Sequence, residues 1–262
     1  MRNLWKWAIG AVVAIAVLIP VGTYVFIHFV EGDAPAPLTL DSSSGQAATS
    51  TSLTATGSTS TTATTTTATS GTTATTAATA ATATTAASGG ATVTYRPTSD
   101  SILGYRVQER LFGQANEAFG RTSSITGSMT ISGATVSAVD LSVDMKTVKS
   151  NQSQRDEQFN SRIMETSRFP TATFKLSQPV VLSGVPTDAT VVDAKATGDL
   201  SLHGVTKSVT FDIKTQRDGA NIKVNGTIPV VFADYRISNP SGGPATTEDH
   251  GVLEFLVVFA RA

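Results

Sequence analysis

Residues 138–145 read Ala138-Val-Asp-Leu-Ser-Val-Asp-Met145, and this stretch decides the fold class. Apolar and polar residues alternate at every position from Val139 to Met145. Successive side chains of an extended strand point to opposite faces, so this stretch has one apolar face and one polar face. Strands with one dry and one wet face are typical of antiparallel sheets. The stretch therefore predicts an antiparallel β-strand with one buried face.

The same alternation recurs along the C-terminal two thirds of the chain. Phe174 and Leu176 are separated by a lysine, and Phe211 and Ile213 by an aspartate. Turn signals separate these stretches, and Asp218-Gly219 between two of them is a strong cue for a hairpin. About eight strands at this spacing predict an all-β barrel or sandwich.

One segment reads as a helix. Within residues 153–166, Ser153 and Asp156 resemble a capping box, and Phe159 and Ile163 share a helix face at i, i+4. We expect a single short helix here in an otherwise all-β domain.

The last segment, residues 251–259, is apolar at nearly every position. A strand that is buried on both faces explains this pattern best, because neither set of alternating side chains then meets water. We expect the predicted helix to cover the outer face of this strand.

The N-terminal region carries an uncharged, mostly apolar run from Trp7 to Val30. As a helix, a run of about 24 residues rises ~36 Å, more than the ~30 Å hydrocarbon layer of a bilayer. Arg2 and Lys6 precede the run and Glu31 and Asp33 follow it, which places the N-terminus in the cytoplasm and the rest outside. A cleaved signal peptide is the alternative, but its apolar region is usually only about 7–15 residues long. We expect residues 1–32 to be a single-pass anchor in the cell membrane.

Residues 33–91 are predicted to be a stalk. Between Thr49 and Ala87, 20 of 39 residues are Thr and 11 are Ala, with no charge and no aromatic residue. Such a segment buries too little apolar area to offset chain entropy. As a coil, about 57 residues would span ~40 Å on average. We expect a disordered stalk that is dispensable for folding and holds the working domain away from the membrane.

Residues 92–262 form the globular domain, in which 17 acidic residues balance 17 basic ones. This balance argues against electrostatic capture of nucleic acid. The chain contains no Cys, which removes disulfides and thiol chemistry. Its sequence has no nucleophile elbow, phosphate-binding glycine loop or dinucleotide fingerprint.

The domain contains two histidines, His203 and His250. Gly204 follows His203 in a predicted turn, so we expect the glycine to adopt the unusual backbone angle and the imidazole to face solvent. His250 follows Glu248 and Asp249, a trio that could in principle bind a metal, but consecutive residues of an extended chain point to opposite sides. We expect neither histidine to be catalytic or a metal ligand, and the neighbouring carboxylates to favour the charged form of His250.

The apolar faces of the strands enclose either a filled core or a ligand cavity, and alternation does not distinguish the two. If a cavity exists, the expected lining residues are Tyr105, Val107, Met129, Leu141, Val143, Phe159, Phe174, Leu176, Leu202, Phe211, Ile213, Val230 and Phe232.

Three features of the domain resemble the YceI-like family of lipocalin-like β-barrels, which bind polyisoprenoids and other lipids. The first is Arg155-Asp-Glu-Gln-Phe159 followed by Phe169-Pro-Thr-Ala-Thr-Phe174. The second is Gly198-Asp-Leu-Ser-Leu-His-Gly-Val-Thr-Lys-Ser-Val-Thr-Phe211, and the third is the order of strands from about Val93 to Phe259. The resemblance covers the globular domain and neither the anchor nor the stalk.

This resemblance implies an eight-stranded antiparallel barrel with one short helix and a hydrophobic tunnel for a long apolar chain. We therefore expect a membrane-tethered, extracytoplasmic binding protein for a long-chain lipid, an isoprenoid by resemblance, without a cofactor. A homodimer is compatible with the sequence. The alternatives are a solid-core extracellular interaction module that acts through its outer surface, and an enzyme that uses His250 with Glu248 or Asp249. Residues 232–251 are richer in Pro and Gly than the family pattern, so the resemblance says least about the cavity mouth.

Overall fold

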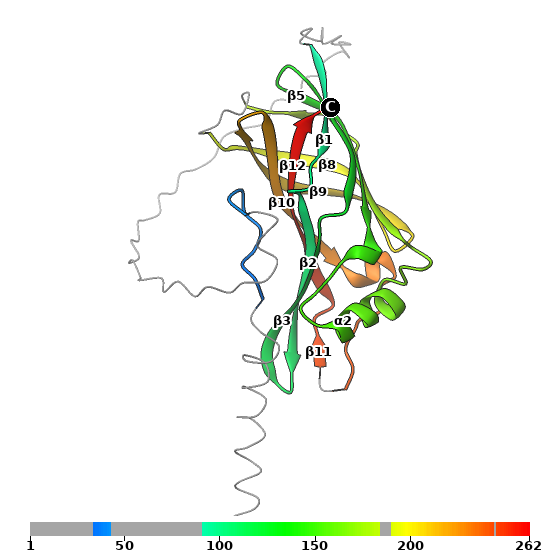
Figure 1. The fold of residues 1–262 in the computed structure, drawn as a ribbon. Helices are drawn as coiled ribbons and strands as arrows, with labels where there is room; N and C mark the ends of the chain where they lie inside the picture. The colour runs from blue at the N-terminus through cyan, green and yellow to red at the C-terminus, as the bar shows by residue number, and fades with distance from the viewer. Residues whose placement is uncertain (1–33, 43–90, 184–189, 244) are drawn as a thin grey trace, which may run out of the picture.

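The computed structural model describes residues 34–42, 91–183, 190–243 and 245–262, and Figure 1 shows their arrangement. The predicted membrane anchor and residues 43–90 of the predicted stalk lie outside the described residues. Within the described ranges, no helix is both long and apolar enough to cross a membrane.

Eight antiparallel strands close into a ring, which confirms the predicted barrel. The last strand of the ring returns to the first, with Tyr95 paired to Arg261 and Pro97 to Phe259. Tight turns join several neighbours, and Gly219 adopts φ +58° in the predicted hairpin turn. In spatial order the ring contains β1 (Thr92–Pro97), β4 (Ile125–Ser132), β5 (Thr135–Asp144), β6 (Thr171–Leu176), β8 (Val192–Leu202), β9 (Val205–Asp218), β10 (Asn221–Val231) and β12 (His250–Arg261).

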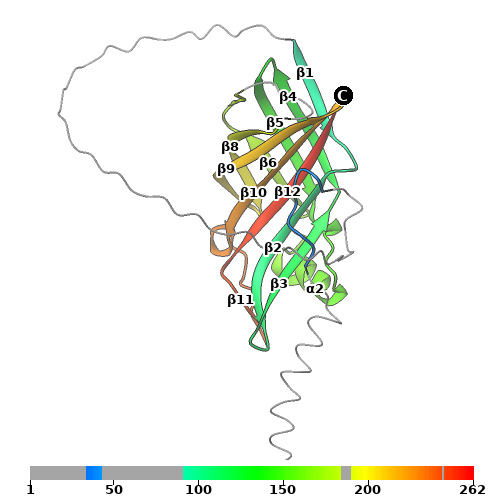
Figure 2. The ribbon, with the colours of Figure 1, turned by 90° about the vertical axis from the view of Figure 1, so that its left-hand side faces the viewer.

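Further strands extend this ring at one end. β2 (Ile102–Leu111) pairs with the first half of β12, and β3 (Gln114–Thr122) pairs with β2 as a hairpin that projects beyond the ring (Figure 2). β11 (Ala245–Thr247) pairs with the outer end of β2, while β7 (Val180–Val181) pairs with β5 at the opposite end of the barrel. The hairpin of β2 and β3 therefore extends the barrel wall beyond the ring at one end.

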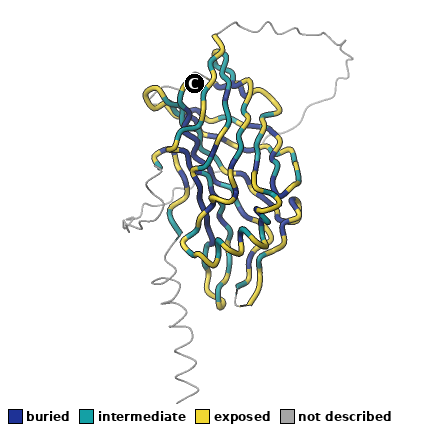
Figure 3. Tube along the Cα trace, turned by 45° about the vertical axis from the view of Figure 1, so that its right-hand side comes forward, coloured by how far each residue is buried: buried dark blue, intermediate teal, exposed yellow. Residues whose placement is uncertain are grey.

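Buried and exposed residues alternate along the ring strands, as the sequence pattern predicts (Figure 3). The most regular cases are β8 and β9, where inward residues such as Leu200 and Phe211 are buried and outward residues such as Asp199, Thr210 and Asp212 are exposed. One apolar face thus points into the barrel and one polar face points to water.

The predicted helix is shorter and less regular than expected. It begins as α2 (Ser153–Gln158) and continues as a π-helical turn, η4 (Phe159–Ile163). The predicted capping box is wrong, because the carboxylate of Asp156 instead accepts hydrogen bonds from the backbone N–H and the hydroxyl of Ser150, both at 2.7 Å. Two 3₁₀ turns complete the described helical elements, η3 (Met145–Thr147) and η5 (Phe232–Tyr235).

β12 is buried on both faces, as predicted, but the helix does not cover its outer face. Residues 34–42, which we call the strap, lie there instead (Figure 1). Leu38 and Leu40 pack against Ile102, Leu256 and Val258 in an apolar cluster outside the barrel. The expectation that residues 33–91 are entirely disordered is therefore wrong for the strap, whose two leucines supply apolar surface that the Thr-rich remainder lacks.

Candidate functional site

The interior of the barrel contains two adjoining cavities. The outer cavity, about 650 Å³, lies where the β2–β3 hairpin, α2 and η5 meet, and the inner cavity, about 210 Å³, lies within the ring. Four residues line both cavities: Leu103, Met145, Leu202 and Leu253. The two cavities therefore follow one another along the barrel axis, and the choice that alternation left open is resolved in favour of a hollow interior.

The structure places all thirteen candidate lining residues in a cavity wall. The outer cavity is lined by Tyr105, Val107, Phe159, Val230 and Phe232, and Leu202 lines both cavities. The inner cavity receives Met129, Leu141, Val143, Phe174, Leu176, Phe211 and Ile213. Eleven of them lie on strands, where period-two alternation explains their placement, whereas Phe159 lies on η4 and Phe232 on η5. Their role in binding stays a prediction.

Aromatic rings fill part of the inner cavity and set its shape. Phe211 contacts Phe174 and Phe255 edge to face, with ring centroids 5.4 and 5.8 Å apart. Gly198 on β8 and Gly226 on β10 make room for these rings, since a Cβ on Gly198 would lie 2.5 Å from the Phe174 ring and one on Gly226 2.7 Å from the Phe255 ring. The sequence shows the glycines but not which rings they admit.

Polar groups gather at the mouth of the outer cavity. Arg155 on α2 forms an ion pair with Glu109 on β2, with nitrogen and oxygen 3.4 Å apart, and both side chains are largely buried. Behind this pair the ring of Tyr105 stacks on Phe159, with centroids 5.2 Å apart. Burial raises the pKa of Tyr105 well above its usual value, so its hydroxyl stays protonated. The mouth can thus offer both charge and hydrogen bonds to the polar end of a ligand, while the wall behind it is apolar.

Sequence reasoning missed Glu109 as a residue of this mouth. It follows Tyr105 and Val107 at steps of two, so alternation alone places it on the same inward face. A charged residue at the end of an otherwise apolar strand face was the signal in the sequence that could have placed it there. Arg155, the first residue of a motif that resembles the YceI-like family, also lies at the mouth.

The expectation that His203 is solvated is wrong. Its side chain is buried, and its Nδ1 lies 3.1 Å from the backbone carbonyl oxygen of Tyr235. Phe169 packs edge to face on the imidazole at 4.6 Å. His203 and Gly204 both adopt positive φ, +50° and +75°, in a two-residue turn that tucks the imidazole inward. The imidazole is buried because η5 and Phe169, which are distant in the sequence, pack over this turn.

His250 is exposed at the start of β12, beside the two carboxylates that the sequence places before it. Its Nδ1 lies 2.9 Å from Asp249 and its Nε2 3.3 Å from Glu248, so both neighbouring carboxylates reach it despite the extended chain. The hydrogen bond to Asp249 raises the pKa of His250, and the same bond lowers the pKa of Asp249. Among the described residues, no three His, Asp or Glu side chains are grouped so as to hold a metal ion.

Fold and cavity together define a class: an antiparallel β-barrel with an apolar interior that opens at one end beside a short helix. The YceI-like domain matches residues 97–259, and the chain belongs to this family. A UPF0312 protein of Pseudomonas putida (strain W619) is 33% identical over 131 residues, which is 47% of this chain and 65% of the relative. A UPF0312 protein of Shewanella denitrificans is 34% identical over 38% of this chain and 50% of its own length. The chain thus spans between half and just under two thirds of these relatives.

The solved structures agree on the fold. A polyisoprenoid binding domain from Saccharophagus degradans, described as implicated in plant cell wall breakdown, superposes with a TM-score of 0.52 at 17% identity. The superposition covers 65% of this chain and 99% of that structure. At this level of identity the likeness concerns the barrel and not its ligand.

Proposed function

We propose that the protein binds a long-chain lipid, an isoprenoid in the first instance, inside the barrel, and that it does so without catalysis. The observation that carries this proposal is the pair of adjoining cavities, about 650 and 210 Å³, lined mainly by apolar side chains. Burying an apolar chain there gains about 25 cal/mol per Å² removed from water. The name of the Saccharophagus degradans domain supports an isoprenoid as the ligand.

The proposed setting is extracytoplasmic, with the chain held in the cell membrane by residues 1–32. Its support is the charge asymmetry around the apolar run from Trp7 to Val30. The cavities inside the barrel favour the lipid-binding proposal over the solid-core interaction module. The polar pair of Arg155 and Glu109 at the mouth would contact the headgroup, while the apolar tail would lie deeper.

Two neighbouring valines on β10 test this proposal. Val230 lines the outer cavity, whereas Val231 points outward and is 45% exposed. The full chain would be extracted from membranes in mild detergent, and its bound lipid identified by mass spectrometry. We expect stoichiometric lipid in the wild type and in Val231→Glu, and at least a tenfold loss in Val230→Glu, because a carboxylate in the wall is costly to bury.

A folded wild-type chain without lipid, unable to take up a fluorescent isoprenoid, would contradict the proposal. Circular dichroism shows whether Val230→Glu still folds. If it does not, Phe174→Glu in the inner wall serves instead, with the exposed neighbour Lys175 replaced by Glu as its control.

A further inference from the structure

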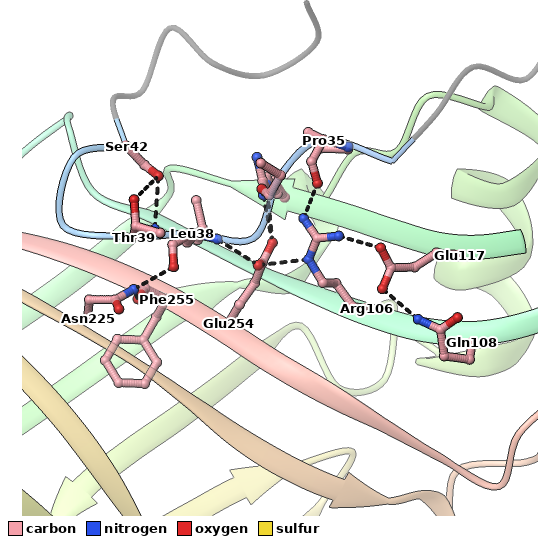
Figure 4. A network of polar contacts seen from close by, with 12 residues as sticks. Pro35, Leu38, Thr39, Ser42, Arg106, Gln108, Glu117, Asn225, Glu254 and Phe255 are labelled. Atoms are coloured by element: carbon pink, nitrogen blue, oxygen red, sulfur yellow. Dashed lines mark hydrogen bonds and ion pairs between the residues drawn. The ribbon is translucent and has the colours of Figure 1, made fainter. Parts of the chain in front are cut away.

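The strap is held on the barrel by a built polar site and not by apolar contact alone (Figure 4). The carboxylate of Glu254, 1% exposed, accepts hydrogen bonds from Arg106 at 2.9 Å and from Arg121 at 3.0 Å. It also accepts one from the backbone N–H of Leu38 at 3.0 Å. A buried charge with three donors is fully satisfied only when the strap is docked.

The two arginines extend this site to the strap carbonyls. A guanidinium N–H of Arg106 donates to the carbonyl oxygen of Pro35, and one of Arg121 donates to that of Ala36 at 2.6 Å. Further along, Asn225 donates to the carbonyl oxygen of Leu38 at 3.0 Å. Charge-assisted bonds to main-chain groups fix the position and the direction of the strap.

The strap runs along the barrel with its first residues toward the cavity mouth. Leu40 belongs to the cluster with Ile102 at the start of β2, whereas Pro35 contacts Arg106 four residues further along that strand. β2 continues from Arg106 to the tip of the β2–β3 hairpin, at the mouth of the outer cavity (Figure 2). The N-terminal end of the strap therefore lies nearer the mouth end of the barrel than its C-terminal end does.

Little chain separates the docked strap from the apolar run. Val30 and Pro35 are five residues apart, which span at most ~17 Å when fully extended. The hairpin tip at Phe112 is six strand residues beyond Arg106, about 20 Å. If the run from Trp7 to Val30 spans the bilayer, the docked strap brings the hairpin tip to the membrane surface.

The hairpin tip has the composition of a membrane-facing rim. Phe112 is 58% exposed at the tip and also lines the outer cavity. Arg110, beside it, and Arg162, at the cavity mouth on η4, are both exposed. An exposed aromatic side chain flanked by basic residues suits the boundary between headgroups and acyl chains.

We propose that the strap docks the barrel with its mouth against the bilayer, so that the lipid passes between membrane and cavity without crossing water. This inference rests on the proposed anchor and lipid-binding function. Residues 43–90, which lie between the strap and β1 in the chain, then do not set the distance between membrane and barrel. The predicted stalk that holds the domain away from the membrane is replaced by a short tether that holds it close.

Depth measurements on the membrane-bound full chain test the orientation. The chain has no native Cys, so single cysteines can carry a fluorophore whose quenching by quencher-labelled lipids reports proximity to the bilayer. Gln114→Cys reports on the hairpin tip, and Val181→Cys, 73% exposed on β7, reports on the opposite end. We expect strong quenching at position 114 and at least a fivefold weaker effect at 181.

Two changes should release the mouth from the membrane. Leu38→Asp with Leu40→Asp places charges in the apolar cluster, and Thr39→Asp, exposed between them, is the matched control. Inserting about 20 Gly and Ser residues after Asp33 lengthens the tether by ~25 Å without touching the strap. We expect quenching at position 114 to fall to the level at 181 in the double variant and the insertion, and to stay at the wild-type level in Thr39→Asp.

Weak quenching at position 114 in the wild type, or quenching that survives the insertion, would overturn the proposal, as would a mature chain that lacks its N-terminal run. Failure of the proposed function looks different. In that case position 114 is quenched and released as described, but the extracted protein carries no lipid.

Discussion

The inner and outer faces of β12 are built from alternating residues of one strand. Phe255, Val257 and Phe259 point inward and line the inner cavity, whereas Glu254, Leu256 and Val258 point outward beneath the strap. The inner face is apolar and borders the inner cavity. The outer face is packed around an ionised network and closed by a remote segment of the same chain. A strand that is buried on both faces can therefore have two different environments, one that borders a cavity and one that is closely packed.

The largest expected effect on stability comes from replacing Glu254, on the outer face of β12. Replacing it with Gln leaves Arg106 and Arg121 buried without their common anion, and we expect a loss of about 3–5 kcal/mol in the free energy of unfolding. Denaturant unfolding of the domain from residue 34 onward measures this. Glu117, which pairs with Arg106 nearer the surface, is the control, and Glu117→Gln should cost about 1 kcal/mol or less. Equal effects at the two positions would contradict a buried network.

Removal of the strap should come next. A domain that begins at residue 91 exposes Ile102, Leu256 and Val258 and loses the strap's bonds to the arginines. We expect it to be about 2–4 kcal/mol less stable than the domain that begins at residue 34. Deleting only residues 43–90, with a short Gly-Ser replacement, should change stability by less than about 1 kcal/mol. If both deletions are neutral, the strap does not contribute to the fold.

Leu256 and Phe255, adjacent on β12, separate stability from binding. Leu256→Ala opens a void beneath the strap and should lower the free energy of unfolding by about 2–5 kcal/mol, with ligand affinity unchanged. Phe255→Ala removes apolar wall and should weaken isoprenoid binding about tenfold. A fluorescent isoprenoid titration alongside unfolding curves checks both. Loss of affinity in Leu256→Ala would mean that the two faces are coupled.

His203 gives a smaller effect at the turn between β8 and β9. His203→Asn keeps a residue that tolerates positive φ but removes the imidazole packed on Phe169. We expect a loss of about 1–2 kcal/mol in thermal or denaturant unfolding. His250→Gln is the control, and it should leave the melting temperature nearly unchanged. If His203→Asn leaves the stability unchanged, the result would support a solvated imidazole, as expected from the sequence.

The smallest effect concerns the pH response of His250. Its pKa is raised by the hydrogen bond to Asp249, so the folded state favours the protonated imidazole. Any stabilisation from this pair is present below the unfolded pKa, about 6.5, and is lost as pH rises through the higher folded value. NMR titration of the imidazole should show the raised pKa, and Asp249→Asn should return it toward the unfolded value. An unshifted midpoint in the wild type would contradict the observed pair.

Most of the barrel could be predicted because the residue pattern within each strand specifies which side chains face inward. The alternation in residues 138–145 assigns each side chain to a face whatever the partner strand, and all thirteen inward candidates lie in a cavity wall. The helix was placed correctly at Ser153, but its capping was not, since the partner of Asp156 is Ser150 and precedes the helix. Ring closure and the extra pairing of β2 with β12 depend on strands far apart in the sequence.

The sequence by itself determined that the domain is all-β and antiparallel, which residues face inward, and that β12 is dry on both sides. Tertiary structure alone decided that the interior is hollow, that His203 is buried, and that the strap rather than α2 covers β12. The physical reason is the range of the interactions. Alternation is set by the geometry of a single strand, whereas Leu38 is buried because it packs against Leu256 and Val258 and because Glu254, 216 positions away in the chain, accepts its backbone N–H.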